Sequence, residues 1–220
     1  MNNVNDVNVC NGRHASWSKL MGALLLCTTN NSLYDYVVCI DSDCIFQNIR
    51  KPLKDLIDKY PEHDLIIANN GPYHAHLPCC AFFICKNTNW TRDFLKKWYN
   101  NPLPARDSEI WKRVLDVANK TYATPVFDCG HFWEQDSMWV LFQDPEIAKH
   151  IQLYDEPIMY SEVKDQFLLH ISHERHEIRK TYFLEYVIHL EKQTKQSFET
   201  ILSIIPVIMY DTVDIHTNYF

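Results

Sequence analysis

The stretch YDYVVCIDSDCIF (residues 34–46) joins an apolar run to a pair of carboxylates. Residues 36–40 are all apolar or aromatic, and the stretch predicts a short, buried β-strand over residues 35–40. Asp41 and Asp43 follow it, and in an extended chain residues i and i+2 point to the same side. The stretch therefore predicts two carboxylates that approach one ion at the carboxyl end of a strand, where open α/β sheets place their ligands.

The expected ion is Mg²⁺ or Mn²⁺, because hard divalent cations prefer oxygen ligands and often complete their shell with substrate phosphates. A net charge of −7 over 220 residues argues against a nucleic-acid partner, which would require an excess of Lys and Arg. An acidic protein can still bind a phosphorylated ligand through a metal ion. The alternative is that Asp41 caps the following turn and that Asp43 is only solvated.

The rest of the chain predicts one α/β domain over residues 1–220, with residues 175–220 as a mostly helical C-terminal extension. Helices that alternate with strands indicate a mostly parallel sheet. The expected helices are 15–29, 51–60, 87–101, 105–120, 133–144 and 175–202, the further strands are 64–68, 81–86, 150–155 and 166–171, and 69–80 is expected to be a loop.

The eight cysteines are expected to be buried free thiols, because a chain of this length and 46% hydrophobic content does not need disulfides. A zinc site made from Cys79, Cys80 and Cys85 with His74 and His76 is the alternative, although CxxC spacing is absent. The first residues, MNNVNDVNVCNGRH, lack the apolar segment of a signal peptide. No apolar run approaches the ~20 residues that span a bilayer. We expect a soluble, cytoplasmic protein.

Five segments, taken in order, resemble the GT-A-type glycosyltransferases. They are ASWSKL, YDYVVCIDSDCIF, CCAFFICKNTNW, FWEQDSMW and QFLLHISHERHEIRK. The likeness is to the fungal and plant galactosyl- and xylosyltransferase branch and to related enzymes of large DNA viruses, for which the location would be the host cytoplasm. It covers the chain from about residue 13 to about residue 180. It implies a GT-A, Rossmann-like fold, with a mostly parallel sheet flanked by helices.

The resemblance implies a metal-dependent enzyme that transfers a sugar from a nucleotide diphosphate donor, most commonly UDP, to a glycan or other hydroxyl acceptor. Asp41 and Asp43 would hold Mn²⁺ or Mg²⁺ against the two donor phosphates, and Ser42 lies between them in the donor-binding segment. His170, after a late strand, matches a third metal ligand, with His173 as the alternative. By itself, a histidine that ends an apolar strand is more typical of a packed core residue.

Glu134 and Asp136 are candidates for the acceptor side of the reaction. An inverting transferase needs a carboxylate base to take the proton of the acceptor hydroxyl. Asp136 is the first candidate and Glu134 the second. The resembled branch has an amide opposite Asp136, which leaves inversion and retention open. The alternative is that both carboxylates simply favour a helix N-terminus.

Donor contacts are implied for Trp17 and Lys19, which match a W-x-K step before the D-x-D strand, and for Arg175 and Lys180. Charge-assisted hydrogen bonds from such basic groups suit diphosphate oxygens. The alternatives are a core tryptophan beside a solvated lysine, and a solvated basic helix face.

Two other functions compete with sugar transfer. In a haloacid-dehalogenase-type phosphohydrolase, Asp41 would be the nucleophile and Asp43 the acid/base. That pattern requires Thr or Val where Ile45 stands, and a later lysine and acidic pair that we do not find. The second is a non-catalytic sugar-binding module on a degenerate transferase fold. It is suggested by the short segment before Arg13, where the nucleoside-binding strand is expected.

Overall fold

The computed structural model describes residues 15–28, 34–48, 50–70, 74–101, 134–157, 167–171 and 176–194, together with Glu109, Lys112 and Asp116. Contacts divide the chain into two units, Met1–His170 and Ile171–Phe220. Each unit is described by itself. A single domain over residues 1–220 stays a prediction.

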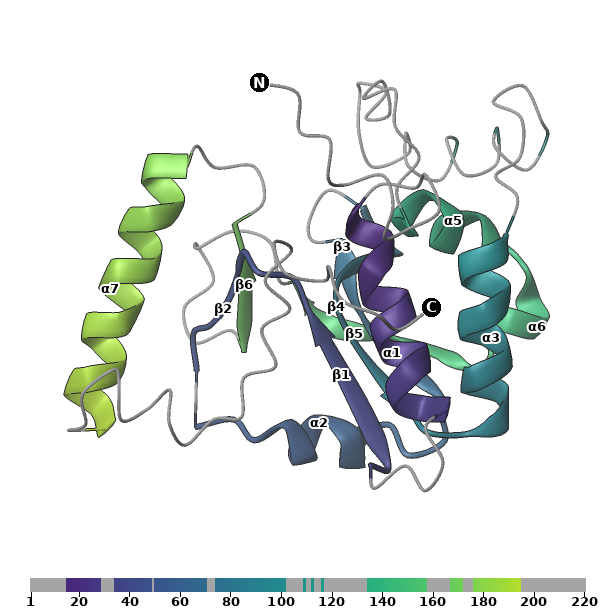
Figure 1. Cartoon of the computed structure of the whole chain (residues 1–220), viewed down its shortest axis with the longest axis horizontal. Coiled ribbons are helices and arrows are strands. Elements are labelled where there is room, and N and C mark those ends of the chain that lie inside the picture. The colour runs from purple at the N-terminus through teal and green to yellow at the C-terminus, as the bar shows by residue number, and fades with distance from the viewer. Residues whose placement is uncertain are drawn as a thin grey trace, which may run out of the picture. The chain divides into compact units, whose positions relative to one another are not determined.

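The first unit contains a four-stranded sheet (Figure 1) in the order β1 (Tyr36–Ile40), β4 (His74–Lys86), β3 (Leu65–Asn70), β5 (Ile151–Pro157). Strand β4 pairs antiparallel with both β1 and β3, and among the described strands only β3 and β5 are parallel. A small antiparallel sheet joins β2 (Cys44–Phe46) to β6 (Leu168–His170). The predicted GT-A, Rossmann-like, mostly parallel sheet is therefore wrong.

The error begins at residues 69–80, which were expected to form a loop. Strand β3 continues to Asn70 and β4 begins at His74, so only residues 71–73 separate them. Such a short connection suits an antiparallel pair, whereas parallel strands need a crossover of a dozen or more residues. The apolar pattern of the strands does not indicate whether they pair parallel or antiparallel, because β3 is buried at every position. An antiparallel sheet covered on both faces needs the same continuous apolar runs as a parallel one.

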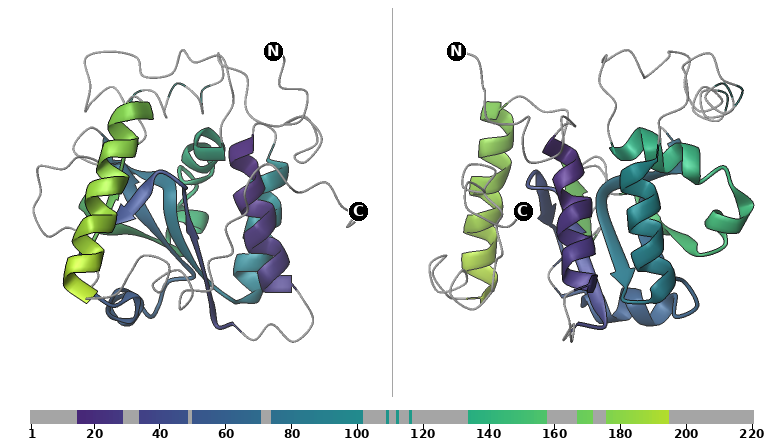
Figure 2. Two further views of the ribbon diagram at one scale, coloured as in Figure 1. Left: turned by 60° about the vertical axis from the view of Figure 1, so that its left-hand side comes forward. Right: turned by 45° about the vertical axis from the view of Figure 1, so that its right-hand side comes forward.

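Five α-helices of the first unit are described over their full length, and their residues account for most of the helical predictions. A 3-10 turn (Ala15–Trp17) leads into α1, and Figures 1 and 2 show α1 beside α3, with which it is in contact. The helices are α1 (Ser18–Thr28), α2 (Leu53–Lys59), α3 (Asn89–Asn100), α5 (Glu134–Leu141) and α6 (Pro145–Ala148). In the second unit α7 spans His176–Thr194, within the predicted helical extension. The predicted helix 105–120 lies outside the described residues except for Glu109, Lys112 and Asp116.

The buried side chains form two apolar clusters, and successive residues of a strand alternate between them. One cluster packs α1, α3 and α5 against Leu65, Ile67 and Phe83. The other contains Ile66 and Phe82 with residues of α2 and β6. Because neighbouring strand residues point to opposite faces, Phe82, Phe83 and Ile84 of β4 alternate between the two clusters. Ala81 and Phe82 belong to the same cluster, near the point where the register between β3 and β4 shifts.

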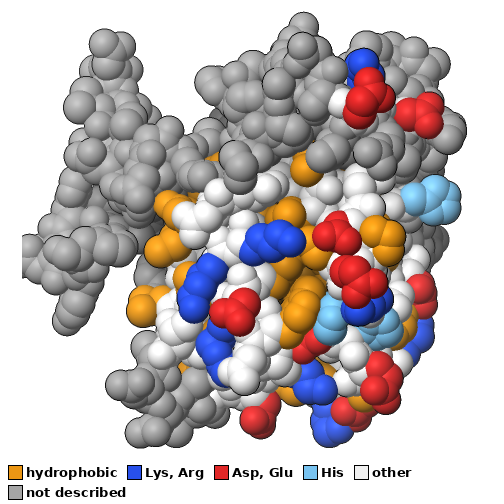
Figure 3. All heavy atoms as spheres, turned by 90° about the vertical axis from the view of Figure 1, so that its right-hand side faces the viewer, with side chains coloured by type: hydrophobic (Ala, Val, Ile, Leu, Met, Phe, Trp, Pro, Cys, Tyr) orange, Lys and Arg blue, Asp and Glu red, His pale blue; other side chains and the backbone are white. Residues whose placement is uncertain are grey.

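Two features of the described residues bear on the expected partners, namely the length of the helices and the charges on one face. None of the described helices is long and apolar enough to cross a bilayer. On the face around α3 and α6, Lys and Arg side chains alternate with Asp and Glu (Figure 3), rather than forming a basic stripe.

Candidate functional site

The turn after β1 presents the first carboxylate to a lysine. The amide of Asp41 donates to the carbonyl oxygen of Ala81 at 2.8 Å, and the amide of Cys44 donates to the carbonyl oxygen of Asp41 at 3.0 Å. These bonds fix a tight turn over residues 41–44 at the end of β1. In this turn Asp41 Oδ1 accepts a hydrogen bond from Lys19 Nζ, near the start of α1, at 2.6 Å.

Lys19 is the centre of a partly buried charge cluster. Its ammonium group also lies 2.8 Å from Glu134 Oε1 and donates to the carbonyl oxygen of Cys80 at 2.9 Å. The side chain of Lys19 is 15% exposed and that of Glu134 only 4%. Burial works to lower the pKa of Lys19, but the charges of Glu134 and Asp41 outweigh it and raise this pKa above its ordinary value. Lys19 is therefore charged, and it holds two carboxylates that come from different elements.

Glu134 begins α5, and packing holds that helix end in place. The indole Nε1 of Trp98 donates to the carbonyl oxygen of Glu134 at 2.9 Å, and Gln135 Oε1 accepts from the amide of Cys80 at 3.1 Å. While Oε1 of Glu134 pairs with Lys19, its Oε2 is buried and has no hydrogen-bond partner among the described residues. This oxygen can accept a hydrogen bond or a proton from a ligand.

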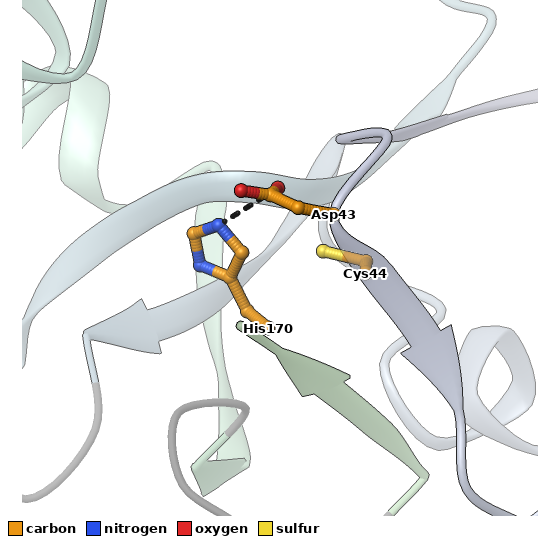
Figure 4. A group of neighbouring side chains, drawn as sticks. All are labelled: Asp43, Cys44 and His170. Atoms are coloured by element: carbon orange, nitrogen blue, oxygen red, sulfur yellow. Dashed lines mark ion pairs between the residues drawn. The ribbon is translucent and has the colours of Figure 1, made fainter. Parts of the chain in front are cut away.

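The second carboxylate meets a histidine from the small sheet. In the β2–β6 ladder Cys44 is the partner of His170, so the residue before Cys44 comes close to the imidazole. His170 Nε2 lies 3.2 Å from Asp43 Oδ1 (Figure 4), and its Nδ1 lies 4.0 Å from Cys79 Sγ. Burial works to lower the pKa of His170, but its hydrogen bonds to Asp43 and Cys79 raise this pKa to about 10.

Among the described residues, Asp43, Cys44 and His170 form a group that could hold a metal ion. Their ligand atoms all lie within 4.8 Å of one another. A carboxylate oxygen and an imidazole nitrogen suit Mn²⁺ as well as Zn²⁺, so the residues fit a divalent cation. Asp41 is not a member of this group, and its carboxylate pairs with Lys19 instead. Coordination of one ion by both Asp41 and Asp43 stays a prediction.

The remaining predicted residues are spread more widely. Ser42 is exposed in the turn between the two carboxylates. Trp17 is a core residue, 1% exposed, with its ring edge-to-face with Tyr99, which is the alternative given for it above. Asp136 is buried in α5.

The basic residues predicted beyond His170 belong to the second unit or lie outside the described residues. Lys180 is exposed on α7 of the second unit. Arg175 and His173 lie outside the described residues. Their contacts with a donor stay predictions.

The site contains Gln135 and Cys44, to which the sequence analysis gave no role. Cys79 had been considered only for a zinc site with Cys80 and Cys85, and otherwise as a buried thiol. The tandem Cys79-Cys80 in a strand could have indicated one thiol on each face. Cys79 indeed belongs to one apolar cluster and Cys80 to the other, together with Cys85, so the structure does not bring these three thiols together as a zinc site. The pairing of β2 with β6 carries no local sequence signal.

A search of protein-family models and a search of curated proteins find no match to this chain. The fold and the site define a mixed α/β protein with a mostly antiparallel sheet. The end of β1 carries a lysine–carboxylate cluster and an Asp–Cys–His group that could hold a metal ion.

Proposed function

We propose that this protein is a metal-dependent glycosyltransferase that moves a sugar from a nucleotide diphosphate donor, such as a UDP-sugar, to a hydroxyl acceptor. The observation that supports it is the 3.2 Å contact between Asp43 and His170. The sequence resemblance implied these two residues as ligands of one ion, although they are far apart in the chain. The sheet does not have the topology expected from that resemblance, so the proposal rests on the site.

Asp43 and His170 would hold the ion. A bound divalent cation would supply Lewis-acid stabilisation for the negative charge that develops on the departing diphosphate. His170 must give up its Nε2 proton to act as a ligand, because only the neutral imidazole has a free electron pair. The contact with Asp43 would orient Nε2 of the ring toward the ion that both residues bind (Figure 4).

Lys19 has a positioning role in this proposal. By pairing with both Asp41 and Glu134, it fixes the turn after β1 against the start of α5. The three side chains carry a net charge of about −1, from one ammonium and two carboxylates. A negative cluster beside the metal group favours a cation over a free anion at this edge of the sheet.

Two carboxylates remain candidates for the acceptor side. Within the described part of the chain, Oε2 of Glu134 has no hydrogen-bond partner, which supports this residue as an acceptor of a hydroxyl proton or of a sugar hydroxyl hydrogen bond. Asp136 lies two residues further along the same helix. Proton removal by either would make the acceptor oxygen a better nucleophile toward the anomeric carbon.

The test is donor turnover by purified full-length protein with a panel of nucleotide sugars and Mn²⁺, with release of the nucleoside diphosphate measured by chromatography. Asp43→Asn and His170→Gln should each reduce turnover at least about a hundredfold, because an oriented catalytic metal contributes several kcal/mol. Asp155→Asn is the matched control, since this exposed carboxylate pairs with Lys59 on the surface. Undiminished turnover in both site variants, or in EDTA, would contradict the proposal.

The same protein separates the competing functions. Release of phosphate from phosphomonoesters without donor turnover would favour the phosphohydrolase. Calorimetry with UDP and Mn²⁺ addresses the non-catalytic module, because an inactive scaffold should show no metal-dependent nucleotide binding.

A further inference from the structure

Two thiols flank the contact between Asp43 and His170, and sugar transfer makes no use of them. Cys44 is opposite His170 in the β2–β6 ladder, so both side chains point to the same side of that sheet. Cys79 approaches from β4, with its Sγ 4.0 Å from His170 Nδ1. The two ring nitrogens of His170 therefore have different neighbours, a carboxylate at Nε2 and a thiol at Nδ1.

The distances are close to those of a coordination shell. With Zn–ligand bonds of about 2.0–2.3 Å, the ligand atoms of a tetrahedral site lie roughly 3.3–3.8 Å apart. The distance of 3.2 Å between Asp43 Oδ1 and His170 Nε2 is only slightly shorter than this range. The ligand atoms of Asp43, Cys44 and His170 lie within 4.8 Å of one another, so a side-chain shift of about 1 Å would bring them onto one ion.

We propose that Asp43, Cys44 and His170 form an O,S,N site that binds a thiophilic divalent cation such as Zn²⁺ or Co²⁺ in preference to Mg²⁺ and Mn²⁺. A thiolate ligand favours Zn²⁺ over the harder ions, and the Irving–Williams order adds to this preference. On binding, the Sγ–H bond of Cys44 breaks, a metal–sulfur bond forms, and the proton passes to solvent, together with the proton from Nε2 of His170. The inference rests on the metal role proposed for Asp43 and His170, but not on sugar transfer.

Three protein ligands leave one tetrahedral position for an exogenous oxygen. This is the pattern of catalytic zinc sites, whereas structural sites are closed by four protein ligands. Cys79 has a positioning role, because its sulfur near Nδ1 favours the tautomer in which Nε2 is free to coordinate. The site could therefore take a phosphate or water oxygen as its fourth ligand.

The experiment is a Co²⁺ titration of the metal-free, fully reduced chain, followed by absorption spectroscopy. We expect visible d–d bands of a four-coordinate ion and a near-ultraviolet sulfur-to-cobalt charge-transfer band, both removed by stoichiometric Zn²⁺. Cys44→Ser should abolish the charge-transfer band. Cys79→Ser should keep the band and weaken binding about tenfold, as for other groups that orient a ligating histidine. Cys39→Ser is the matched control, since Cys39 is also half-buried but packs against the other cluster.

The wild-type chain alone can overturn the proposal if Co²⁺ gives no charge-transfer band, or if Mn²⁺ displaces Zn²⁺ at comparable concentrations. A band that persists in Cys44→Ser would also overturn it, because the sulfur would then come from elsewhere. Far-ultraviolet circular dichroism shows whether each variant is folded, and Cys44→Ala is the substitute if the serine variant is not. A charge-transfer band without donor turnover would leave this site standing while sugar transfer fails. Mn²⁺-dependent turnover without the band would support sugar transfer and contradict this metal site.

Discussion

The carboxylate of Asp41 accepts a hydrogen bond from Lys19 at 2.6 Å. The second carboxylate of the same D-x-D segment, Asp43, lies against His170 instead. The pair is thus shared between two partners, one from α1 and one from β6. This division gives each carboxylate a different expected role, structural for Asp41 and metal-binding for Asp43.

The first prediction compares the two carboxylates by substitution. Asp43→Asn should weaken binding of Mn²⁺ or Zn²⁺ at least about tenfold, because it removes a charged ligand. Asp41→Asn should weaken it less, since Lys19 already holds that carboxylate. Isothermal titration calorimetry on the two variants and on the Asp155→Asn control measures the difference. Equal losses in both site variants would show that Asp41 is also a ligand.

The second prediction concerns the stability of the lysine cluster. Lys19→Met should lower the free energy of unfolding by about 3–5 kcal/mol, because it leaves the charge of Glu134 buried without a partner. Urea unfolding measures the loss. The double variant Lys19→Met/Glu134→Gln should lose less than the sum of the two single variants, since the residues are in direct contact.

A surface pair provides the control for this cluster. Lys59→Met removes an exposed partner of Asp155 and should have little effect on unfolding. A loss in Lys19→Met below about 1 kcal/mol would mean that the cluster contributes no more than an exposed ion pair.

The third prediction concerns the pH dependence of stability in metal-free protein. The pKa of His170 is raised from 6.5 to about 10, so the folded state binds a proton that the unfolded state releases. The stabilisation is fully present below about pH 6.5 and is lost as pH rises through about 10. The free energy of unfolding then falls by at most about 1.4 kcal/mol per pH unit.

Denaturant unfolding between pH 6 and 10 in EDTA measures this slope. His170→Gln should remove that part of the decline, because glutamine does not titrate. A wild-type profile identical to that of the variant would contradict the prediction.

The fourth prediction concerns thiol reactivity. Burial raises the pKa of Cys39 to about 12, and it also raises the pKa values of Cys44, Cys80 and Cys85. At pH 8 only about one Cys39 in ten thousand would then be a thiolate, the form that reacts. Iodoacetamide should label these four residues slowly in the native protein and rapidly in guanidinium chloride. Peptide mapping by mass spectrometry gives the rate at each cysteine, and rapid native labelling of Cys39 would contradict its burial.

Local sequence patterns identified most elements of the described fold. The strands predicted at 35–40 and 64–68 overlap β1 and β3, and the amphipathic segment at 87–101 contains α3. Strand β2 was missed, because its three residues, Cys44–Phe46, are too few for a periodic signal. Part of β4 was interpreted as a loop, since polar and proline residues precede its apolar half.

For the candidate site, the sequence supplied the residue types and the tertiary structure supplied their partners. Asp41 and Asp43 were predicted as site residues from their positions after a strand, and His170 was predicted from the resemblance. The contact between Asp43 and His170, and the approach of Cys44 and Cys79 to His170, depend on which strands are neighbours. The Lys19–Asp41 pair depends on how α1 packs against β1. Glu134 was predicted as a carboxylate at a helix start, but its buried contact with Lys19 depends on the packing of α5 against α3 and β4.

The sequence by itself determined where this chain is apolar, where its strands end, and where carboxylates, thiols and histidines follow them. These features depend on interactions between residues that are close in the chain. Only the tertiary structure decided that the sheet is mostly antiparallel and that the two carboxylates of residues 41 and 43 have separate partners. When both faces of a sheet are buried, parallel and antiparallel strands have the same apolar sequence pattern. The register between two paired strands is set by packing between segments that are distant in the chain.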